Sequence, residues 1–449
     1  MRVLNIKQTV RSFFSLVLVI IISGCSNNEP INIVASDYHE GVDKLTEIMV
    51  HDIFSPPVAS RIYAYPNIAA YEIIAANSDE FKSLNGQIDG MPQISPASNE
   101  NINIELAALI AYMDVGRTLI FSEEKMKTYR DEKYEAWKKL NKKVFDASLE
   151  YGMAVSNQII DWKEGDMYNE TRTMPKFTIN TDDQSRWQPT PPAYMDGIEP
   201  AWNKIRPFVL DSAAQFIPVQ HPEFSMEKES DFYKELEEVY QVSKEIDFKG
   251  DESEEIAIAQ FWDCNPYVSV TRGHLMFATK KITPGAHWIG ITKIACEKSD
   301  FDFENTVYAN TKTSIAIFDA FISCWDEKYR SNLVRPETLI NNYIDDQWEP
   351  VLQTPPFPEY PSGHSVVSGA ASIVLTQIFG DGFSFDDDTE QPYGLPVRSF
   401  TSFKAAAEEA AISRLYGGIH YMAAVENGIN QGYNVGELVS NSLIMKSDN

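Results

Sequence analysis

Cysteine is scarce in this sequence, with 4 in 449 residues. No Cys-x-x-C pair occurs, so a zinc ribbon or a dithiol redox centre has no support. One cysteine, Cys25, lies near the N-terminus, and the others are Cys264, Cys296 and Cys324. Three cysteines can form at most one disulfide, and we expect them to be buried structural thiols.

Positive charge is also in short supply. Lysine and arginine number 38 against 65 aspartates and glutamates, which gives a formal net charge of −27. Residues 1–24 carry three of the cations and no acid, so the rest of the chain carries −30 (35 − 65). Such an acidic surface repels nucleic acid and anionic lipid, and we expect neither as a partner. An anion-binding site would therefore have to be a local positive pocket.

No run of apolar residues is long enough to span a bilayer. Phe13 to Ile22 is a short apolar run that follows three cations, so residues 1–24 are predicted to be a signal peptide. Residues 22–25, Ile-Ser-Gly-Cys, resemble the bacterial lipoprotein signal, in which Cys25 is the lipidated residue; an ordinary secretory signal is the alternative. We expect residues 25–40 to be a tether, and the protein to be exported and held on a membrane by lipid alone.

A repeated strand pattern is absent too, and the chain is predicted to be mainly helical. Apolar spacings of three and four residues predict helices over 41–54, 62–75, 106–121, 140–162, 231–245, 254–262, 308–330 and 403–416, with further helices after Gly363 and from about His420. Pro56 and Pro57 are expected to break the first of these helices, and Pro66 to interrupt the second. Residues 165–207 predict long ordered loops. We divide the chain into an N-terminal helical region, 41–230, and a C-terminal helical bundle, 231–449.

Residues 381–396 read as an acidic loop. Asp386, Asp387 and Asp388 lie in a row there, and such triplets are usually solvated. Calcium binding is possible, but the alternating ligand spacing of an EF-hand is absent.

Three segments in the last third of the chain carry the residue types that an oxyanion site needs. The first contains Lys328 and Arg335, seven residues apart, with Pro336 directly after. Two helical turns would return both cations to one face, and the proline disfavours a helical Arg335, which we expect to leave the helix end and turn inward. Basic residues at this spacing are common, and this pair alone is weak evidence.

The second segment is Pro361-Ser362-Gly363-His364, followed by an apolar run. Ser362 can cap the helix, and Gly363 lets the backbone approach a ligand. N–H groups at a helix start bind oxyanions, and His364 would face such an anion from the first turn. A capped helix with an incidental histidine explains this segment equally well.

The third segment is Ser413-Arg414, followed by His420 across Gly417 and Gly418. Arg414 can offer a fork of donors to an oxyanion. A histidine in such surroundings would more often be a packed core residue.

Taken together and in this order, the three segments resemble the signature of the vanadium haloperoxidase and type-2 phosphatidic acid phosphatase superfamily. The long N-terminal half resembles the soluble haloperoxidase branch more than a compact acid phosphatase. Within that branch, the size of the chain, its lipoprotein start and the run Phe-Trp-Asp-Cys-Asn-Pro-Tyr (261–267) are most similar to bacterial vanadium-dependent iodoperoxidases. The resemblance implies an all-α fold of two four-helix bundles with long wrapping loops and a vanadate pocket in the C-terminal bundle. It also implies vanadate as cofactor and hydrogen peroxide and halide as substrates.

The resemblance further implies roles for individual residues. His420 would be the ligand to vanadium, and His364 the acid–base group. The oxygens of vanadate would be held by Lys328, Arg335, Ser362, Gly363, His364 and Arg414. Vanadium would act as a Lewis acid without changing its valence.

One position departs from the family pattern. An aspartate usually stands four residues after the last histidine, where this chain has Ala424. Because a metal-bound histidine has its other nitrogen fixed by a carboxylate or a carbonyl, we expect Glu426 or a backbone carbonyl to orient His420.

Halide choice depends on side chains around the pocket. Tyr267, Trp325 and Phe357 are candidates for the halide pocket, with aromatic core as an equally good explanation. Iodide is the easiest halide to oxidise, so we expect iodide first, bromide weakly and chloride not at all. Two other functions stay open: an acid phosphatase with a histidine nucleophile in the same pocket, and a non-catalytic surface lipoprotein that binds oxyanions or glycans.

Overall fold

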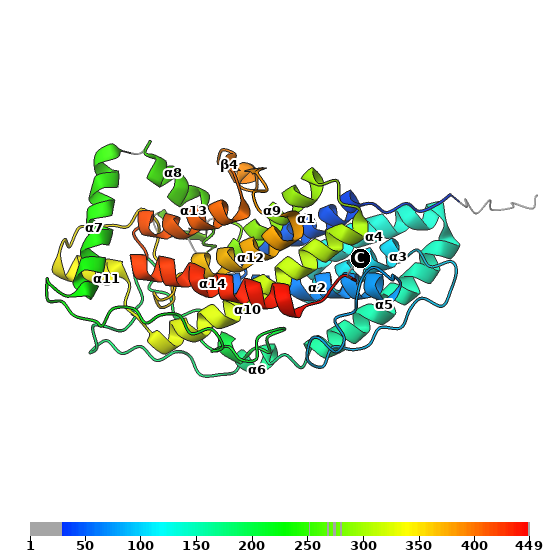
Figure 1. Cartoon of the computed structure of the whole chain (residues 1–449), viewed down its shortest axis with the longest axis horizontal. Coiled ribbons are helices and arrows are strands. Elements are labelled where there is room, and N and C mark those ends of the chain that lie inside the picture. The colour runs from blue at the N-terminus through cyan, green and yellow to red at the C-terminus, as the bar shows by residue number, and fades with distance from the viewer. Residues whose placement is uncertain (1–28, 251, 267–268, 273–274, 279–280, 448–449) are drawn as a thin grey trace, which may run out of the picture.

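The computed structural model describes residues 29–250, 252–266, 269–272, 275–278 and 281–447, with backbone only between 267 and 280. The chain forms an elongated all-α molecule, as predicted (Figure 1). Strands within these ranges are limited to two small antiparallel pairs, β1 (Ser269–Arg272) with β2 (Leu275–Ala278) and β3 (Phe385–Asp387) with β4 (Arg398–Phe400). No helix in the described ranges combines the length and apolarity needed to cross a bilayer.

The N-terminal half contains two helices that are almost entirely buried, α2 (Pro56–Ala76) and α3 (Ile104–Arg117), and the other helices pack around them. The other helices are α1 (Ala35–Asp52), α4 (Glu123–Leu140) and α5 (Lys142–Lys163). Helix α2 lies between α3 and α10 (Phe303–Ser331), which explains why almost all of its side chains are buried. Pro56 begins α2, where a missing N–H costs nothing, and the helix continues through Pro66 because packing on all sides outweighs one lost hydrogen bond.

Two N-terminal predictions need correction. Helix α1 begins at Ala35, so residues 35–40 are helical and not part of a tether; Tyr38 within them is fully buried. The carboxylate of Asp37 accepts from the N–H of Val34 and caps this start. The polar helix α4 was not predicted, since it buries only Met126 and Trp137 and its sequence shows little apolar periodicity.

The loops predicted over 165–207 are present, with only the short α6 (Tyr168–Thr171) and a 3₁₀ turn, η1 (Trp202–Lys204), and the loop structure continues to residue 230. A buried carboxylate on α10 organises one of them. Asp319 accepts from the backbone N–H groups of Phe208, Val209 and Leu210 at 2.8, 2.7 and 3.1 Å. Three donors to one carboxylate satisfy a loop that would otherwise bury unpaired N–H groups.

The C-terminal helices are arranged about a central one, α12 (Gly363–Phe379), on which four of the others pack. The other helices of this half are α7 (Asp231–Lys249), α8 (Glu254–Phe261), α9 (Pro284–Lys298), α10, α11 (Pro336–Tyr343), α13 (Phe403–Tyr416) and α14 (Met422–Ser442). Helix α12 contacts α9, α10, α13 and α14, and runs through the centre of this half (Figure 1). Helix α9 was missed, although Thr283 caps it and Pro284 is its first residue.

Close packing of α14 on α12 depends on glycine. Gly428, Gly432 and Gly436 repeat every four residues along one face of α14. A Cβ at Gly432 would lie 2.2 Å from the carbonyl oxygen of Val366, so only glycine allows this approach. The contact fixes the start of α12, where the N–H of Ser362 donates to the carbonyl of Ala424 at 3.0 Å.

The acidic loop also differs from expectation. Asp386 and Asp388 are exposed, but Asp387 is fully buried in β3 and contacts a buried histidine. Cys264, Cys296 and Cys324 are buried, as predicted, and all three are free thiols.

Candidate active site

Four helix ends bring the predicted residues together. Lys328 lies in the last turn of α10, and Arg335 is the N-cap residue of α11 in an extended conformation, as its place before a proline predicts. His364 lies in the first turn of α12, and Arg414 in the last turn of α13. The turn at Gly418, which has a φ of +73° that favours glycine, carries the chain from Arg414 to His420.

A small buried cavity lies between these ends. His364, His420, Arg414 and Gly363 line it together with aromatic and proline side chains. Lys328 and Arg335 stand behind this lining and are themselves fully buried. Both histidines thus face one cavity, and three cations surround it.

His420 is held from both sides. Its Nδ1 lies 2.8 Å from Oε1 of Glu359, and the same oxygen accepts from the N–H of Tyr421 at 3.0 Å. On the other side Nη1 of Arg335 donates to Nε2 of His420 at 3.1 Å. An imidazole that accepts at Nε2 and donates at Nδ1 is the neutral tautomer whose Nε2 lone pair can bind a metal.

Glu359 takes the place that the sequence prediction gave to Glu426 or to a carbonyl, and that prediction was wrong. Glu426 is exposed to solvent on α14. Glu359 is fully buried, and burial raises its pKa to about 8. Burial and the neighbouring cations hold the pKa of His420 well below its ordinary value. The contact joins residues 61 apart, so the only sequence signal was an acid just before the 361–364 segment.

The cations are held by carbonyl groups. Lys328 donates to three backbone carbonyls of the loop before α12, those of Pro358, Glu359 and Pro361. Arg335 donates to the carbonyls of Phe357 and Ile419, and Arg414 to that of Trp262. Burial lowers the pKa of Lys328 to about 7 and that of Arg335 to about 10. Carbonyl dipoles orient these side chains without cancelling their charge.

Two buried polar atoms at the cavity indicate a ligand site. Nη2 of Arg335 and Nε2 of His364 have no hydrogen-bond partner among the residues that the structure describes. Buried polar groups are almost always paired, so the Nη2 donor of Arg335 indicates a ligand with acceptor oxygens, whereas the unprotonated Nε2 of His364 can accept a proton from a donor in the cavity. His364 also hydrogen-bonds the backbone of Trp262, and burial and Arg414 keep its pKa well below the ordinary value. It is therefore a neutral base at the wall of the cavity.

Gly363 has no side chain, which leaves space for a ligand at the cavity wall. A Cβ there would lie 3.5 Å from the ring of Trp325 and 3.8 Å from Cε of Lys328, where it would fill space in front of the lysine. Ser362 caps α12, as predicted, by accepting from the N–H of Ser365 at 3.3 Å, which leaves its hydroxyl proton free to donate elsewhere. Ser362 is buried but is not among the residues that line the cavity.

Of the three candidate halide-pocket residues, Trp325 and Phe357 line the cavity with ring centroids 5.0 Å apart. The ammonium of Lys328 lies 5.0 Å from the centroid of Phe357. Tyr267 falls outside the described residues. Cys264, Asn265 and Pro284 also line the cavity and were not predicted to do so, although Cys264 and Asn265 belong to the 261–267 run that carries part of the resemblance.

Known proteins resemble this chain over nearly its full length. The family model of the VCPO second helical-bundle domain matches residues 309–447. Among curated protein sequences, none matches the chain. The crystal structure of a bacterial vanadium-dependent iodoperoxidase is 62% identical, with a TM-score of 0.91, and the match covers 94% of this chain and 99% of that one.

Two further structures share the fold at lower identity. They are the holo and apo forms of a bacterial vanadium-dependent chloroperoxidase, each 17% identical, with TM-scores of 0.66 and 0.64. The matches cover 87% and 86% of this chain and 93% and 94% of theirs. With 62% identity to the iodoperoxidase across almost the whole sequence, the chain belongs to the vanadium-dependent haloperoxidase family.

Proposed function

We propose that this protein is a vanadate-dependent haloperoxidase that oxidises halide with hydrogen peroxide, preferring iodide. One observation carries the proposal: two neutral histidines and Arg414 line one cavity, and Lys328 and Arg335 are fully buried behind its lining. Vanadate is a tetrahedral oxyanion with more than one negative charge, and such a pocket compensates for its lost hydration.

The donor set fits vanadate. Nε2 of His420 is the one nitrogen ligand, and Glu359 fixes its tautomer. Lys328, Arg335 and Arg414 supply the positive charge, with Ser362 and the N–H of Gly363 as further donors. When bound, vanadate supplies a Lewis-acidic centre that polarises peroxide and keeps its valence.

His364 performs the proton transfers. Its low pKa keeps Nε2 unprotonated, and this nitrogen can accept a proton from incoming peroxide at the cavity wall. The resulting imidazolium returns the proton as oxygen passes to the halide. Burial of both histidines excludes bulk water, which would compete for the same proton.

Iodide preference is the finer part of the proposal. Trp325 and Phe357 line the cavity, and Tyr267 is included by sequence alone. Apolar aromatic walls suit a large, weakly hydrated anion better than chloride. The order of rates should be iodide, then bromide, with chloride unreacted; chloride oxidation at the iodide rate would contradict it.

We also propose that residues 1–24 are a signal peptide and that Cys25 is lipidated, which would anchor the enzyme to a membrane outside the cytoplasm. The support is the sequence alone, since these residues lie outside those that the structure describes. Labelling with a palmitate analogue tests this, and Cys25→Ser should release the protein from the membrane fraction. A membrane fraction unchanged by that substitution would remove the anchor.

Formation of triiodide by the apoprotein before and after addition of vanadate tests the main activity. We expect turnover only with vanadate and peroxide. Release of phosphate from p-nitrophenyl phosphate without peroxide, together with no halide oxidation, would instead establish the phosphatase. Tight vanadate binding without turnover on any halide would establish a binding protein.

A further inference from the structure

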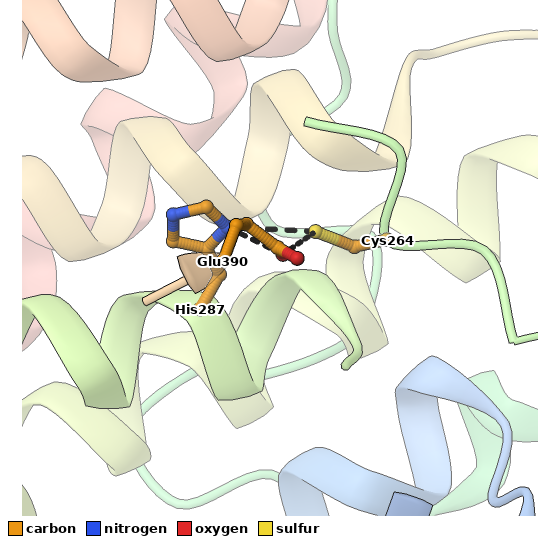
Figure 2. Close-up of side chains that lie close together, drawn as sticks. All are labelled: Cys264, His287 and Glu390. Atoms are coloured by element: carbon orange, nitrogen blue, oxygen red, sulfur yellow. Dashed lines mark hydrogen bonds and ion pairs between the residues drawn. The ribbon is translucent and has the colours of Figure 1, made fainter. Parts of the chain in front are cut away.

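A second group of ligand-type side chains lies beside the cavity. Cys264, His287 and Glu390 converge from three segments: the loop after α8, helix α9, and the loop between β3 and β4 (Figure 2). All three side chains are buried. Cys264 also lines the cavity with His364, so the group borders the active site without being part of the oxyanion shell described above.

The three ligand atoms form a nearly regular triangle. Sγ of Cys264 lies 3.5 Å from Nδ1 of His287 and 3.7 Å from Oε1 of Glu390. Nδ1 of His287 lies 3.4 Å from the same carboxylate oxygen. Figure 2 shows the ring nitrogen, the sulfur and the carboxylate turned toward one another.

These three distances match those between three ligand atoms of a tetrahedral zinc site. With Zn–S of about 2.3 Å and Zn–N and Zn–O of about 2.0–2.1 Å, tetrahedral angles place sulfur about 3.5 Å from each lighter ligand and nitrogen about 3.3 Å from oxygen. Each of the three observed distances lies within about 0.2 Å of the corresponding expected value. Thiolate, imidazole and carboxylate are also the ligands that zinc prefers.

The surroundings of His287 support the same reading. Its other nitrogen, Nε2, lies 2.8 Å from Oδ2 of Asp387, whose second oxygen accepts from the hydroxyl of Thr389 at 2.7 Å. The ring also stacks on Trp262 at 4.4 Å between centroids. A metal-binding histidine typically donates its second N–H to a carboxylate, which turns the first nitrogen toward the metal. Burial of Asp387, unexpected for an acidic triplet, has its explanation here.

We propose that Cys264, His287 and Glu390 bind a zinc ion, with Asp387 as the positioning residue of His287 and the fourth coordination position open to water. Binding releases the thiol proton of Cys264 and the proton on Nδ1 of His287 to solvent. The ion ties the acidic loop to the Trp262–Cys264 segment. Because the backbone of Trp262 bonds both Arg414 and His364, this site supports two residues of the active site.

A metal-free hydrogen-bond network is the rival explanation. Although burial opposes it, the carboxylates of Asp387 and Glu390 hold the pKa of His287 well above its ordinary value, as an imidazolium between two acids requires. Burial raises the pKa of Cys264 to about 11, so the thiol in such a network would be protonated. The network binds no metal, which separates the two explanations.

The test is metal content of the full-length protein. After chelation and dialysis, the protein is titrated with Zn²⁺ and analysed by elemental mass spectrometry, with vanadium counted in the same samples. We expect one zinc per chain, whether or not vanadate is present. Co²⁺ in place of Zn²⁺ should give the absorption of a thiolate–cobalt bond, which reports on Cys264 without any substitution.

Variants assign the ligands. Cys264→Ser and Glu390→Gln should each weaken zinc binding by more than about 100-fold, and Asp387→Asn by about 10- to 100-fold. Cys296→Ser is the matched control, because Cys296 is a buried free thiol on α9 outside the group, and it should bind zinc as the wild type does. A wild-type protein without stoichiometric zinc, or equal zinc in Cys264→Ser, overturns the proposal. Vanadium content and triiodide formation report separately on the haloperoxidase activity.

Discussion

Buried charge is handled differently in the two halves of this molecule. In the N-terminal half, Nε of Arg61 lies 2.6 Å from Oδ2 of Asp166, and Tyr65 donates to the same oxygen at 2.9 Å. Around the cavity, Lys328, Arg335 and Arg414 are equally buried, but their donors meet carbonyl oxygens. A paired buried charge is structural, whereas a buried cation held only by dipoles needs an anion. Charge balance thus distinguishes the three cations of the site from the Arg61–Asp166 pair.

Removing the vanadium ligand should have the largest effect. His420→Ala deletes the nitrogen proposed to bind vanadium, so vanadate affinity should fall by more than about 100-fold and activity should reach background. Vanadium content by mass spectrometry and triiodide formation check this. Normal vanadium content in the variant would show that the ligand is another residue.

Removing the base should separate binding from turnover. His364→Ala keeps the cations and His420, so vanadate should bind nearly as before. Turnover should fall by about 10²- to 10⁴-fold, since the proton transfer from peroxide loses its acceptor. Equal rates for the variant and the wild type, at saturating vanadate, would exclude His364 from the mechanism.

One substitution in each half tests the difference in how buried charge is stabilised. Asp166→Asn leaves Arg61 buried without a counter-charge, and the free energy of unfolding should fall by about 3–5 kcal/mol with unchanged vanadate affinity of the folded protein. Arg335→Met should lose less stability, because it removes an unneutralised cation. Its vanadate affinity should fall by about 10- to 100-fold, as for a hydrogen bond to a charged group. Denaturant unfolding measures the stability of each variant, and titration measures its vanadate affinity. Equal changes in stability and in affinity for the two variants would show that the paired and unpaired buried charges do not differ in role.

Glu359 offers a finer test. Glu359→Gln keeps the shape but lets the amide present a donor to Nδ1 of His420, which disturbs the tautomer. Vanadate affinity should fall by about 10- to 100-fold. Glu426→Gln, on the exposed face of α14, is the control and should match the wild type. A loss in the control alone would restore Glu426 as the orienting acid.

The smallest expected effect is one of pH. In the anion-free protein the pKa of Lys328 is lowered to about 7, so the ammonium loses its proton as pH rises through that value. A bound anion favours the charged form, so binding above pH 7 takes up a proton and the affinity declines with rising pH. Calorimetry in buffers of different ionisation enthalpy measures this uptake, which should be absent from Lys328→Gln.

Sequence alone determined the helical class, several helix boundaries and the residue types of the oxyanion shell. Ser362 as a cap and Arg335 turned inward follow from local rules, in which a neighbour fixes the backbone. Helices α4 and α9 were not predicted, because neither shows a clear apolar stripe. Helix α4 is polar, and α9 begins with Pro and Gly.

Only the tertiary structure decided which groups act on one another. Glu359 orients His420 from 61 residues away, and Asp387 reaches His287 across 100 residues. Asp387 lies in the segment predicted to be an acidic loop, and the sequence predicted no element around Glu359. Their burial depends on packing around α12, and the free energy of a buried charge depends on partners brought by distant segments, which no local pattern encodes.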